Sequence, residues 1–302
     1  RSRGIRRIMK LQSWTHHTSA GFTLRGHHSP PSGRPVLHFL HGNGLSSLTY
    51  APMLAHLSAH FDLFLSDVQG HGDSDHGSRF RGWNHAAEMA AEAWLAHAPR
   101  FGTVPVHAAG HSFGSVLTCL MLAHHPHAFS RGVLLDPVLF TPAMIGMMAL
   151  SDLVGLASRN KLAAKARTRR HHWPDRAAAH AGLHGRGVFR GWSEDSFQAY
   201  IDHALRDVPG GGVELKCRPT REAEIFASYP RRLWSSLARI EQPVLALHGR
   251  DTFAFARRSV TRWAAGKANV QCVQVEGGHC FMLEHPQATA ERVAAFLRDS
   301  PR

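Results

Sequence analysis

The sequence predicts an α/β fold in which a mostly parallel sheet carries helices on both faces. Two observations predict it. Short apolar segments bounded by glycine, proline or aspartate alternate with segments whose apolar residues repeat at helical spacing, once before residue 138 and again after residue 238. The short segments are apolar at nearly every position, which is typical of parallel strands buried on both faces.

The first region is expected to hold strands at residues 21–26, 36–40, 62–67, 106–109 and 132–136, and helices at 51–60, 83–98 and 115–125. The fourth strand is expected to start at Val106, because Pro105 has no N–H for a central ladder. The second region is expected to hold strands at 244–249 and 270–278 and helices at 256–266 and 287–300. Residues 9–137 and 239–302 together form the predicted core.

The stretch between these regions has a different pattern. Strands fade from about residue 138 to 238, where arginine, histidine, glycine and alanine dominate and helical patterns occur at 144–160 and 194–205. We therefore expect residues 138–238 to form a helical cap over the carboxyl edge of the sheet. Residues 1–8 are basic and precede Met9, a plausible start, so we interpret them as a possible non-native leader.

Composition narrows the function classes. Of 302 residues, 43% are hydrophobic and 19% charged, as in ordinary globular proteins, and no apolar run reaches the roughly 18 residues of a membrane span. A cytoplasmic location without stable membrane insertion is the expectation. The net charge of +13 comes without a recognised nucleic-acid motif, so no nucleic-acid partner is predicted. The dense basic stretch at 161–170 is interpreted as a solvated helix face, with an anionic substrate or a phospholipid surface as the open alternative.

Histidine and cysteine do not indicate a metal site. The 25 histidines include adjacent pairs, but none shows the HExxH spacing that places two ligands and a base on one helix face. The four cysteines form no CxxC pair and are expected to be reduced thiols. Cys280, beside His279, is a weaker alternative nucleophile. Neither a metal nor an organic cofactor is predicted.

The motif that carries most of the chemistry is GHSFG, residues 110–114. It directly follows a predicted strand and precedes a predicted helix, the context in which a serine on a sharp turn has an exposed hydroxyl. The helix amino terminus also favours negative charge near that serine. Ser112 is therefore the candidate nucleophile.

Two further motifs supply the candidate partners of Ser112. HGNG, residues 41–44, follows a strand, and acyl transfer needs two donors for the oxyanion of the tetrahedral intermediate. We expect these donors to be the backbone amides of Asn43 and Phe113. GGHCFMLEHP follows the last strand, where His279 on a glycine-flexible loop is the candidate general base.

These motifs, in this order, resemble the α/β-hydrolase family over nearly the whole chain, as does the segment DVQGHGDSD at 67–75. The resemblance implies eight largely parallel strands, a cap over the site and a nucleophile–acid–histidine order. The family often carries its acid in an H-G-x-x-D segment. Here the segment is HGRDTF, so Asp251 comes one residue early and Thr252 occupies the usual position. Asp251 is the preferred acid, and Asp136, after the preceding strand, is the alternative.

The predicted function is that of a serine hydrolase cleaving small-molecule carboxylic esters of short or medium acyl chain through an acyl-enzyme intermediate. Apolar residues of the predicted cap could line an acyl pocket: Met144, Ile145, Met147, Met148 and Leu150. Three alternatives stay open. They are a carbon–carbon bond hydrolase acting on ring-cleavage products, a thioesterase or acyltransferase, and a ligand-binding protein with a degenerate triad. The oligomeric state is not predicted.

Overall fold

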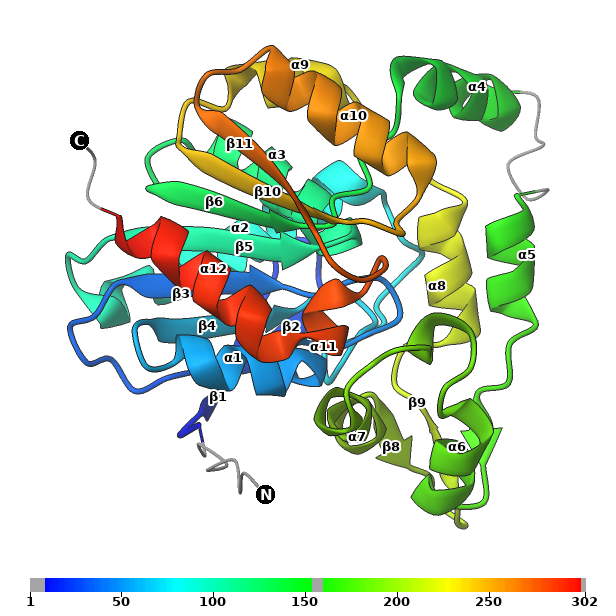
Figure 1. Cartoon of the computed structure of the whole chain (residues 1–302). Helices are drawn as coiled ribbons and strands as arrows, with labels where there is room; N and C mark the ends of the chain where they lie inside the picture. The colour runs from blue at the N-terminus through cyan, green and yellow to red at the C-terminus, as the bar shows by residue number, and fades with distance from the viewer. Residues whose placement is uncertain (1–8, 154–159, 300–302) are drawn as a thin grey trace.

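The computed structural model describes residues 9–153 and 160–299. In that part of the chain, eight strands form one sheet in the order β1-β2-β4-β3-β5-β6-β10-β11 (Figure 1). The strands are β1 (Gln12–His17), β2 (Thr23–His28), β3 (Val36–Leu40), β4 (Asp62–Asp67), β5 (Val106–His111), β6 (Arg131–Leu135), β10 (Val244–Gly249) and β11 (Val270–Val275). From β4 to β11 all neighbouring strands are parallel, which confirms the predicted sheet.

The first strand was not expected from the sequence. β1 pairs antiparallel with β2 at the edge of the sheet, and Trp14 is its single buried residue. Because the other five residues of β1 are polar and lie at an edge, the segment lacks the apolar run that marked the central strands.

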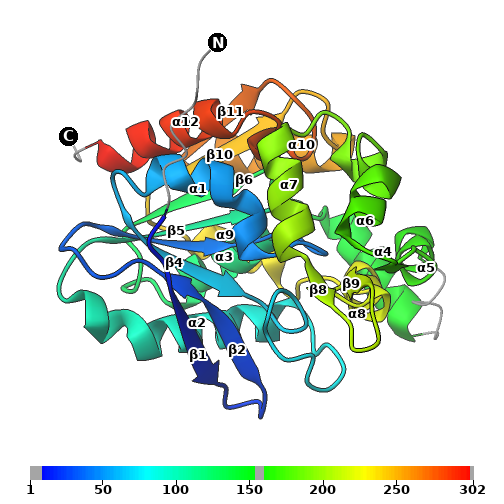
Figure 2. The same ribbon diagram turned by 90° about the horizontal axis from the view of Figure 1, so that it is seen from below.

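Helices cover both faces of the sheet, as predicted. One face is covered by α2 (Trp83–His97), α3 (Phe113–His124) and α10 (Ala254–Ala265), whose buried residues share one core cluster. The other face is covered by α1 (Ala51–Leu57) and α12 (Pro286–Arg298), which share the second cluster. Figure 2 shows α1 and α12 on one side of the sheet and α2 on the other.

The segment between β6 and β10 contains both helices and strands. Its helices are α4 (Pro142–Leu153), α5 (Lys161–Arg167), α6 (Arg176–Leu183), α7 (Glu194–His203), α8 (Pro219–Phe226) and α9 (Leu233–Arg239). The strands β7 (His172–Trp173), β8 (Leu205–Asp207) and β9 (Val213–Leu215) form a small antiparallel sheet. The cap was expected to be helical and is mainly so; its three short strands were not expected, because strands of two or three residues leave no periodicity to detect.

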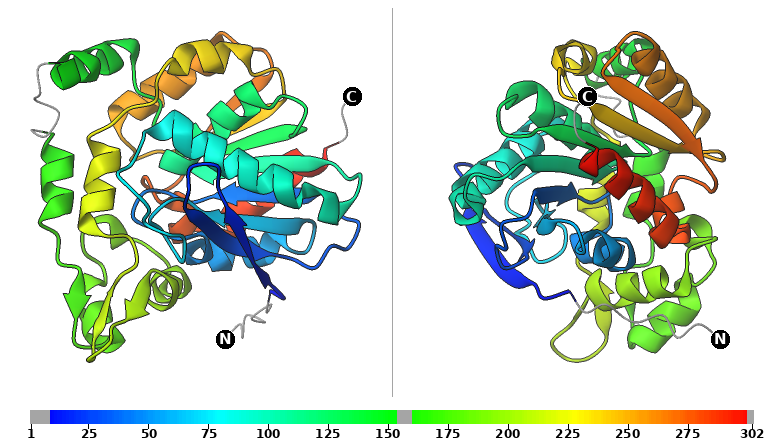
Figure 3. Two further views of the ribbon diagram at one scale, coloured as in Figure 1. Left: turned by 180° about the vertical axis from the view of Figure 1, so that it is seen from behind. Right: turned by 60° about the vertical axis from the view of Figure 1, so that its left-hand side comes forward.

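The inserted segment lies mainly at one end of the large sheet, with α5 beside α8 (Figures 1 and 3). Its last helix, α9, packs against α3 instead. None of the described helices is long and apolar enough to cross a bilayer. The possible leader at residues 1–8 lies outside the described residues, as do residues 154–159 of the helix expected at 144–160.

Candidate active site

Ser112 lies on a strained turn between β5 and α3. Its φ of 53° and ψ of −113° are conformations that a residue with a side chain rarely adopts. The turn closes only because its flanks lack side chains. A Cβ on Gly110 would lie 2.4 Å from the Gly114 carbonyl oxygen, and a Cβ on Gly114 would lie 2.4 Å from the Leu40 carbonyl oxygen. The local sequence thus explains why the serine hydroxyl is presented at this point.

His279 bridges the serine and a carboxylate. It lies between β11 and α11 (Phe281–Glu284), and its Nε2 is 2.9 Å from Ser112 Oγ. Its Nδ1 is 2.5 Å from Asp136 Oδ2. An ionised carboxylate can only accept hydrogen bonds, so His279 Nδ1 carries the hydrogen and donates it to Asp136. Nε2 is then free to accept from the Ser112 hydroxyl. This is the hydrogen-bond order of a nucleophile, a base and an orienting acid.

Asp136 is held by more than the histidine. It directly follows β6, is fully buried, and has a φ of 46°, a second positive value on a residue with a side chain. Its Oδ1 accepts from the Gly249 amide at 2.8 Å, and its Oδ2 accepts from Thr252 Oγ1 as well as from His279. Three donors therefore fix the orientation of this carboxylate.

The structure places Asp251, the preferred acid, away from His279. Its side chain is 65% exposed and pairs with the neighbouring Arg250. The residue after it, Thr252, points inward and donates to Asp136. The preference is corrected for this reason: the loop after β10 turns residue 251 outward and residue 252 inward, so the residue at the position where the family often carries its acid instead donates to Asp136.

The two residues expected to form an oxyanion hole both line the cavity at Ser112. Phe113 is the first residue of α3, where backbone N–H groups have no acceptor within the helix. The side chain of Asn43 is engaged elsewhere, since its Nδ2 donates to the Glu222 carbonyl oxygen at 3.1 Å. This contact leaves the Asn43 backbone amide as the group that this residue can offer to the cavity.

Two buried histidines hold the loop around Asn43. His41 Nε2 accepts from the Val68 amide at 3.1 Å, and His71 Nε2 accepts from the Gly44 amide at 3.0 Å. Burial lowers the pKa of both imidazoles, which keeps them neutral and leaves Nε2 able to accept. Neither role was found from the sequence, because 25 histidines made any one of them uninformative.

His111, the residue before the nucleophile, joins three loops of the site. Its Nε2 lies 2.9 Å from the His279 carbonyl oxygen, which can only accept, so Nε2 carries the hydrogen. Burial lowers the pKa of His111, and its neutral Nδ1 then accepts from the Tyr50 hydroxyl at 2.6 Å. Tyr50 in turn accepts from the Gly42 amide at 3.0 Å. This series of hydrogen bonds connects the loops that carry Gly42, Ser112 and His279. It could not be found from the sequence.

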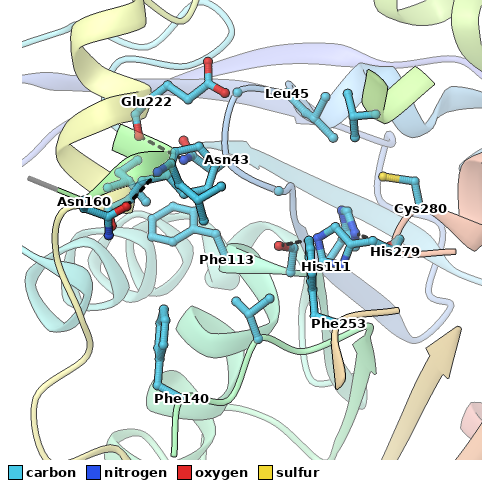
Figure 4. Close-up of a pocket in the computed structure, with 18 of the residues that line it drawn as sticks. Asn43, Leu45, His111, Phe113, Phe140, Asn160, Glu222, Phe253, His279 and Cys280 are labelled. Carbon is cyan, nitrogen blue, oxygen red and sulfur yellow. Dashed lines mark hydrogen bonds between the residues drawn. The ribbon is translucent and has the colours of Figure 1, made fainter. Parts of the chain in front are cut away.

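The cavity above Ser112 has a volume of about 470 Å³ and is lined by both core and insert (Figure 4). Many of the lining side chains are apolar, among them Val138, Phe140, Met144, Met147, Met148, Phe253 and Phe255. Of the residues expected to line an acyl pocket, Met144, Met147 and Met148 do so. Ile145 packs against the core instead, and Leu150 is exposed.

A charged pair also lines the cavity. Arg169 Nη1 donates to Glu222 Oε2 at 2.6 Å, and both side chains are mostly buried, at 23% and 11% exposure. The alternative nucleophile Cys280 also lines the cavity, but burial raises the pKa of its thiol well above its usual range. No cluster of three or more histidine, cysteine or acidic side chains that could hold a metal ion occurs among the described residues.

A profile of the family described as alpha/beta hydrolase fold matches residues 35–286. A serine hydrolase-like protein from Danio rerio is 26% identical over 287 residues, covering 91% of this chain and 85% of that protein. Among solved structures, an E-2-(acetamidomethylene)succinate hydrolase superposes with a TM-score of 0.78 at 21% identity, covering 96% of this chain and all of that one. The thioesterase domain from the curacin biosynthetic pathway gives 0.70 at 18% identity, covering 94% and 99%. At these identities the structures establish the fold alone.

Proposed function

The chain belongs to the alpha/beta hydrolase fold family, and we propose that it is a serine hydrolase that cleaves carboxylic esters of short or medium acyl chain. One observation carries the proposal. Ser112 donates to His279 and His279 donates to Asp136 in one continuous series of hydrogen bonds, and Ser112 and His279 line a mainly apolar cavity. The substrate class inferred is a small molecule, because the cavity of about 470 Å³ is of the size that holds one.

The geometry supports a two-step acyl transfer. In the first step Ser112 Oγ attacks the ester carbonyl while His279 Nε2 takes the hydroxyl proton, and Asp136 stabilises the imidazolium. The amides of Asn43 and Phe113 would stabilise the oxyanion. His279 then returns the proton to the leaving alkoxide, which departs as the alcohol. In the second step water, deprotonated by His279, attacks the acyl-enzyme and releases the acid and free Ser112.

The cavity favours an ester over an acidic ring-cleavage product. The open alternative for the basic stretch at 161–170 was an anionic substrate, and an acidic ring-cleavage product would be a substrate of this kind. Within the cavity, however, the Arg169 guanidinium is paired with the Glu222 carboxylate, so this cation offers no uncompensated charge to an acidic substrate. The apolar side chains that line the cavity with Ser112 fit an unbranched acyl chain better than they fit an acidic substrate.

The proposal is tested with p-nitrophenyl esters from acetate to palmitate, comparing the parent with Ser112→Ala. We expect activity on the shorter esters and a loss of at least about 1,000-fold in kcat for the variant. The matched control is Ser235→Ala, at an exposed serine on α9, which should retain full activity. A fluorophosphonate probe is applied in parallel and should label the parent but not Ser112→Ala.

The outcomes separate the alternatives. A parent that reacts with the probe but hydrolyses none of these esters would refute the ester proposal and favour a carbon–carbon or thioester substrate. A parent that neither reacts nor hydrolyses would favour a ligand-binding protein.

A further inference from the structure

The helix α4 is apolar but has no buried residue. Its twelve residues include two alanines, three methionines, one isoleucine and two leucines, a composition that in most helices faces a core. Met147, Leu150 and Leu153 follow one another at three-residue spacing and are exposed by 67%, 62% and 83%. Such spacing places the three side chains near one another on the helix surface, so they form an exposed apolar stripe along α4.

The apolar surface continues around the cavity entrance. Met147, Leu162, Val188 and Phe253 all line the cavity, yet each is at least 49% exposed. They come from four separate segments of the chain, three of them in the insert. We call these four residues, together with Leu150 and Leu153, the apolar rim. Because the first four residues line the cavity and are also exposed, the cavity opens to solvent beside them.

Exposed cations flank the apolar rim on three of its segments. They are Lys161 and Lys165 beside Leu162, Arg186 and Arg190 beside Val188, and Arg257 after Phe253. Within the described part of the chain, none of these five forms an ion pair. The acids of the same segments are fewer: Asp152 lies on α4, and Asp251 is already paired with Arg250. The surroundings of the entrance are therefore both apolar and cationic.

We propose that the apolar rim and its flanking cations form a docking surface for an anionic lipid surface. Exposed apolar side chains bordered by lysine and arginine are the combination that binds the headgroup and acyl boundary of anionic membranes. The net charge of +13 acts in the same direction. Docking in this way turns the cavity entrance toward the lipid, and an apolar ester could enter without crossing water. That last step rests on the proposed function, whereas the docking does not.

A second copy of the chain fits this surface less well. A two-fold dimer brings the same patch of both subunits together, so the flanking lysines and arginines would face their own copies. Like charges opposed across an interface are unfavourable. An anionic lipid surface has the opposite charge and satisfies both parts of the surface.

The test measures co-sedimentation with vesicles of phosphatidylcholine alone or with about one third phosphatidylglycerol, at low and high salt. The Ser112→Ala protein is used, so that binding is recorded without turnover. We expect binding to the anionic vesicles that weakens with salt. Leu150→Ser/Leu153→Ser and Lys161→Gln/Lys165→Gln should each reduce it by at least about tenfold. None of these four residues lines the cavity, so hydrolysis of a soluble short ester should not change when they are replaced in the parent.

Matched controls separate this surface from exposure in general. Leu95→Ser changes an apolar residue that is 46% exposed on α2, and Arg292→Gln changes an exposed cation on α12. Both should leave vesicle binding intact. The proposal is overturned if the anionic vesicles are not bound, or if the controls lose as much binding as the test variants. A dimer that Leu150→Ser/Leu153→Ser dissociates, without vesicle binding, assigns the surface to a second copy. Vesicle binding without ester hydrolysis refutes the proposed function alone.

Discussion

At the residue scale, the site depends on which aspartate faces His279. Asp136 and Asp251 both follow strands of the same sheet, but Asp136 is fully buried while the Asp251 side chain is 65% exposed. The Asp136 carboxylate accepts from Gly249, Thr252 and His279, so its position is fixed before a substrate arrives. In the proposed mechanism this carboxylate is the orienting acid, which holds the imidazole in the tautomer that can accept the serine proton.

The first prediction compares Asp136→Asn with Asp251→Asn. An amide at 136 can donate to His279 Nδ1 and so favours the wrong tautomer, and we expect kcat for p-nitrophenyl acetate to fall by about 10⁴. Asp251→Asn removes a charge that faces solvent and should leave kcat within about threefold. As a control, both variants should give the same circular dichroism spectrum as the parent. A larger loss in Asp251→Asn would return the acid to the position first expected from the sequence.

Part of the site could be predicted from the sequence, and the remainder depends on the directions of side chains. Ser112, His279 and both candidate aspartates were identifiable because each follows a predicted strand, and parallel strands bring their carboxyl ends to one edge. The sequence did not decide between the two aspartates, since a shift of one residue along a loop changes whether a side chain points inward or outward. Tyr50 and His111 were missed because their roles arise from contacts between loops that are far apart in sequence.

At the scale of elements, the central strands and the covering helices were predictable and the insert was only partly so. The central strands β3 and β4 have five and six residues and are buried along their whole length. In the insert, β7 has two residues and β9 has three, which is too short for a period of two to appear. β7 contacts α6 and β8 contacts α7, and pairing that depends on such tertiary contacts leaves no local pattern.

The second prediction concerns the pair that joins α5 to α8. Arg169, just after α5, donates to Glu222 on α8, and removing the arginine leaves a carboxylate that is 11% exposed without its cation. We expect Arg169→Met to lower the free energy of unfolding by roughly 3 kcal/mol, measured by urea titration. The double variant Arg169→Met/Glu222→Gln should recover part of this loss, because no unpaired charge remains.

Arg176→Met is the matched control for this pair. Arg176 pairs with Asp207, whose side chain is 78% exposed, and solvent screening makes such pairs weak. Its replacement should lower the free energy of unfolding by less than about 1 kcal/mol. Equal effects of Arg169→Met and Arg176→Met would show that the first pair does not hold α5 and α8 together.

At the scale of the whole molecule, the core contains neutral histidines on both sides of the sheet. His38 of β3 packs against Phe64, and burial lowers its pKa to about 3. His107 of β5 packs against Phe61, and burial lowers its pKa to about 4. In the unfolded chain both groups titrate near pH 6.5. Between pH 6.5 and the lowered pKa of each histidine, the folded protein therefore binds fewer protons than the unfolded chain.

The last prediction follows from the sign of that difference. Above pH 6.5 both states are neutral at these positions and the histidines add no pH dependence. As the pH falls below 6.5 the unfolded chain gains protons first, so the free energy of unfolding decreases by about 1.4 kcal/mol per pH unit for each such group. This loss continues to about pH 4 for His107 and about pH 3 for His38. Urea titrations between pH 4.5 and 7 (roughly this window) should show the decline.

His38→Phe tests the cause of the decline. The phenyl ring would lie among the same aromatic neighbours as the imidazole. Because the variant lacks one group that gains a proton on unfolding, the pH slope of its free energy of unfolding should be shallower by about 1.4 kcal/mol per pH unit. His17→Phe, at an exposed position of β1, changes the same side chain outside the core and should keep the parent slope. A neutral buried imidazole must gain a proton when the chain unfolds at acid pH, so removing it must change the pH slope of the free energy of unfolding. An unchanged slope in His38→Phe would therefore mean that the acid sensitivity has another origin.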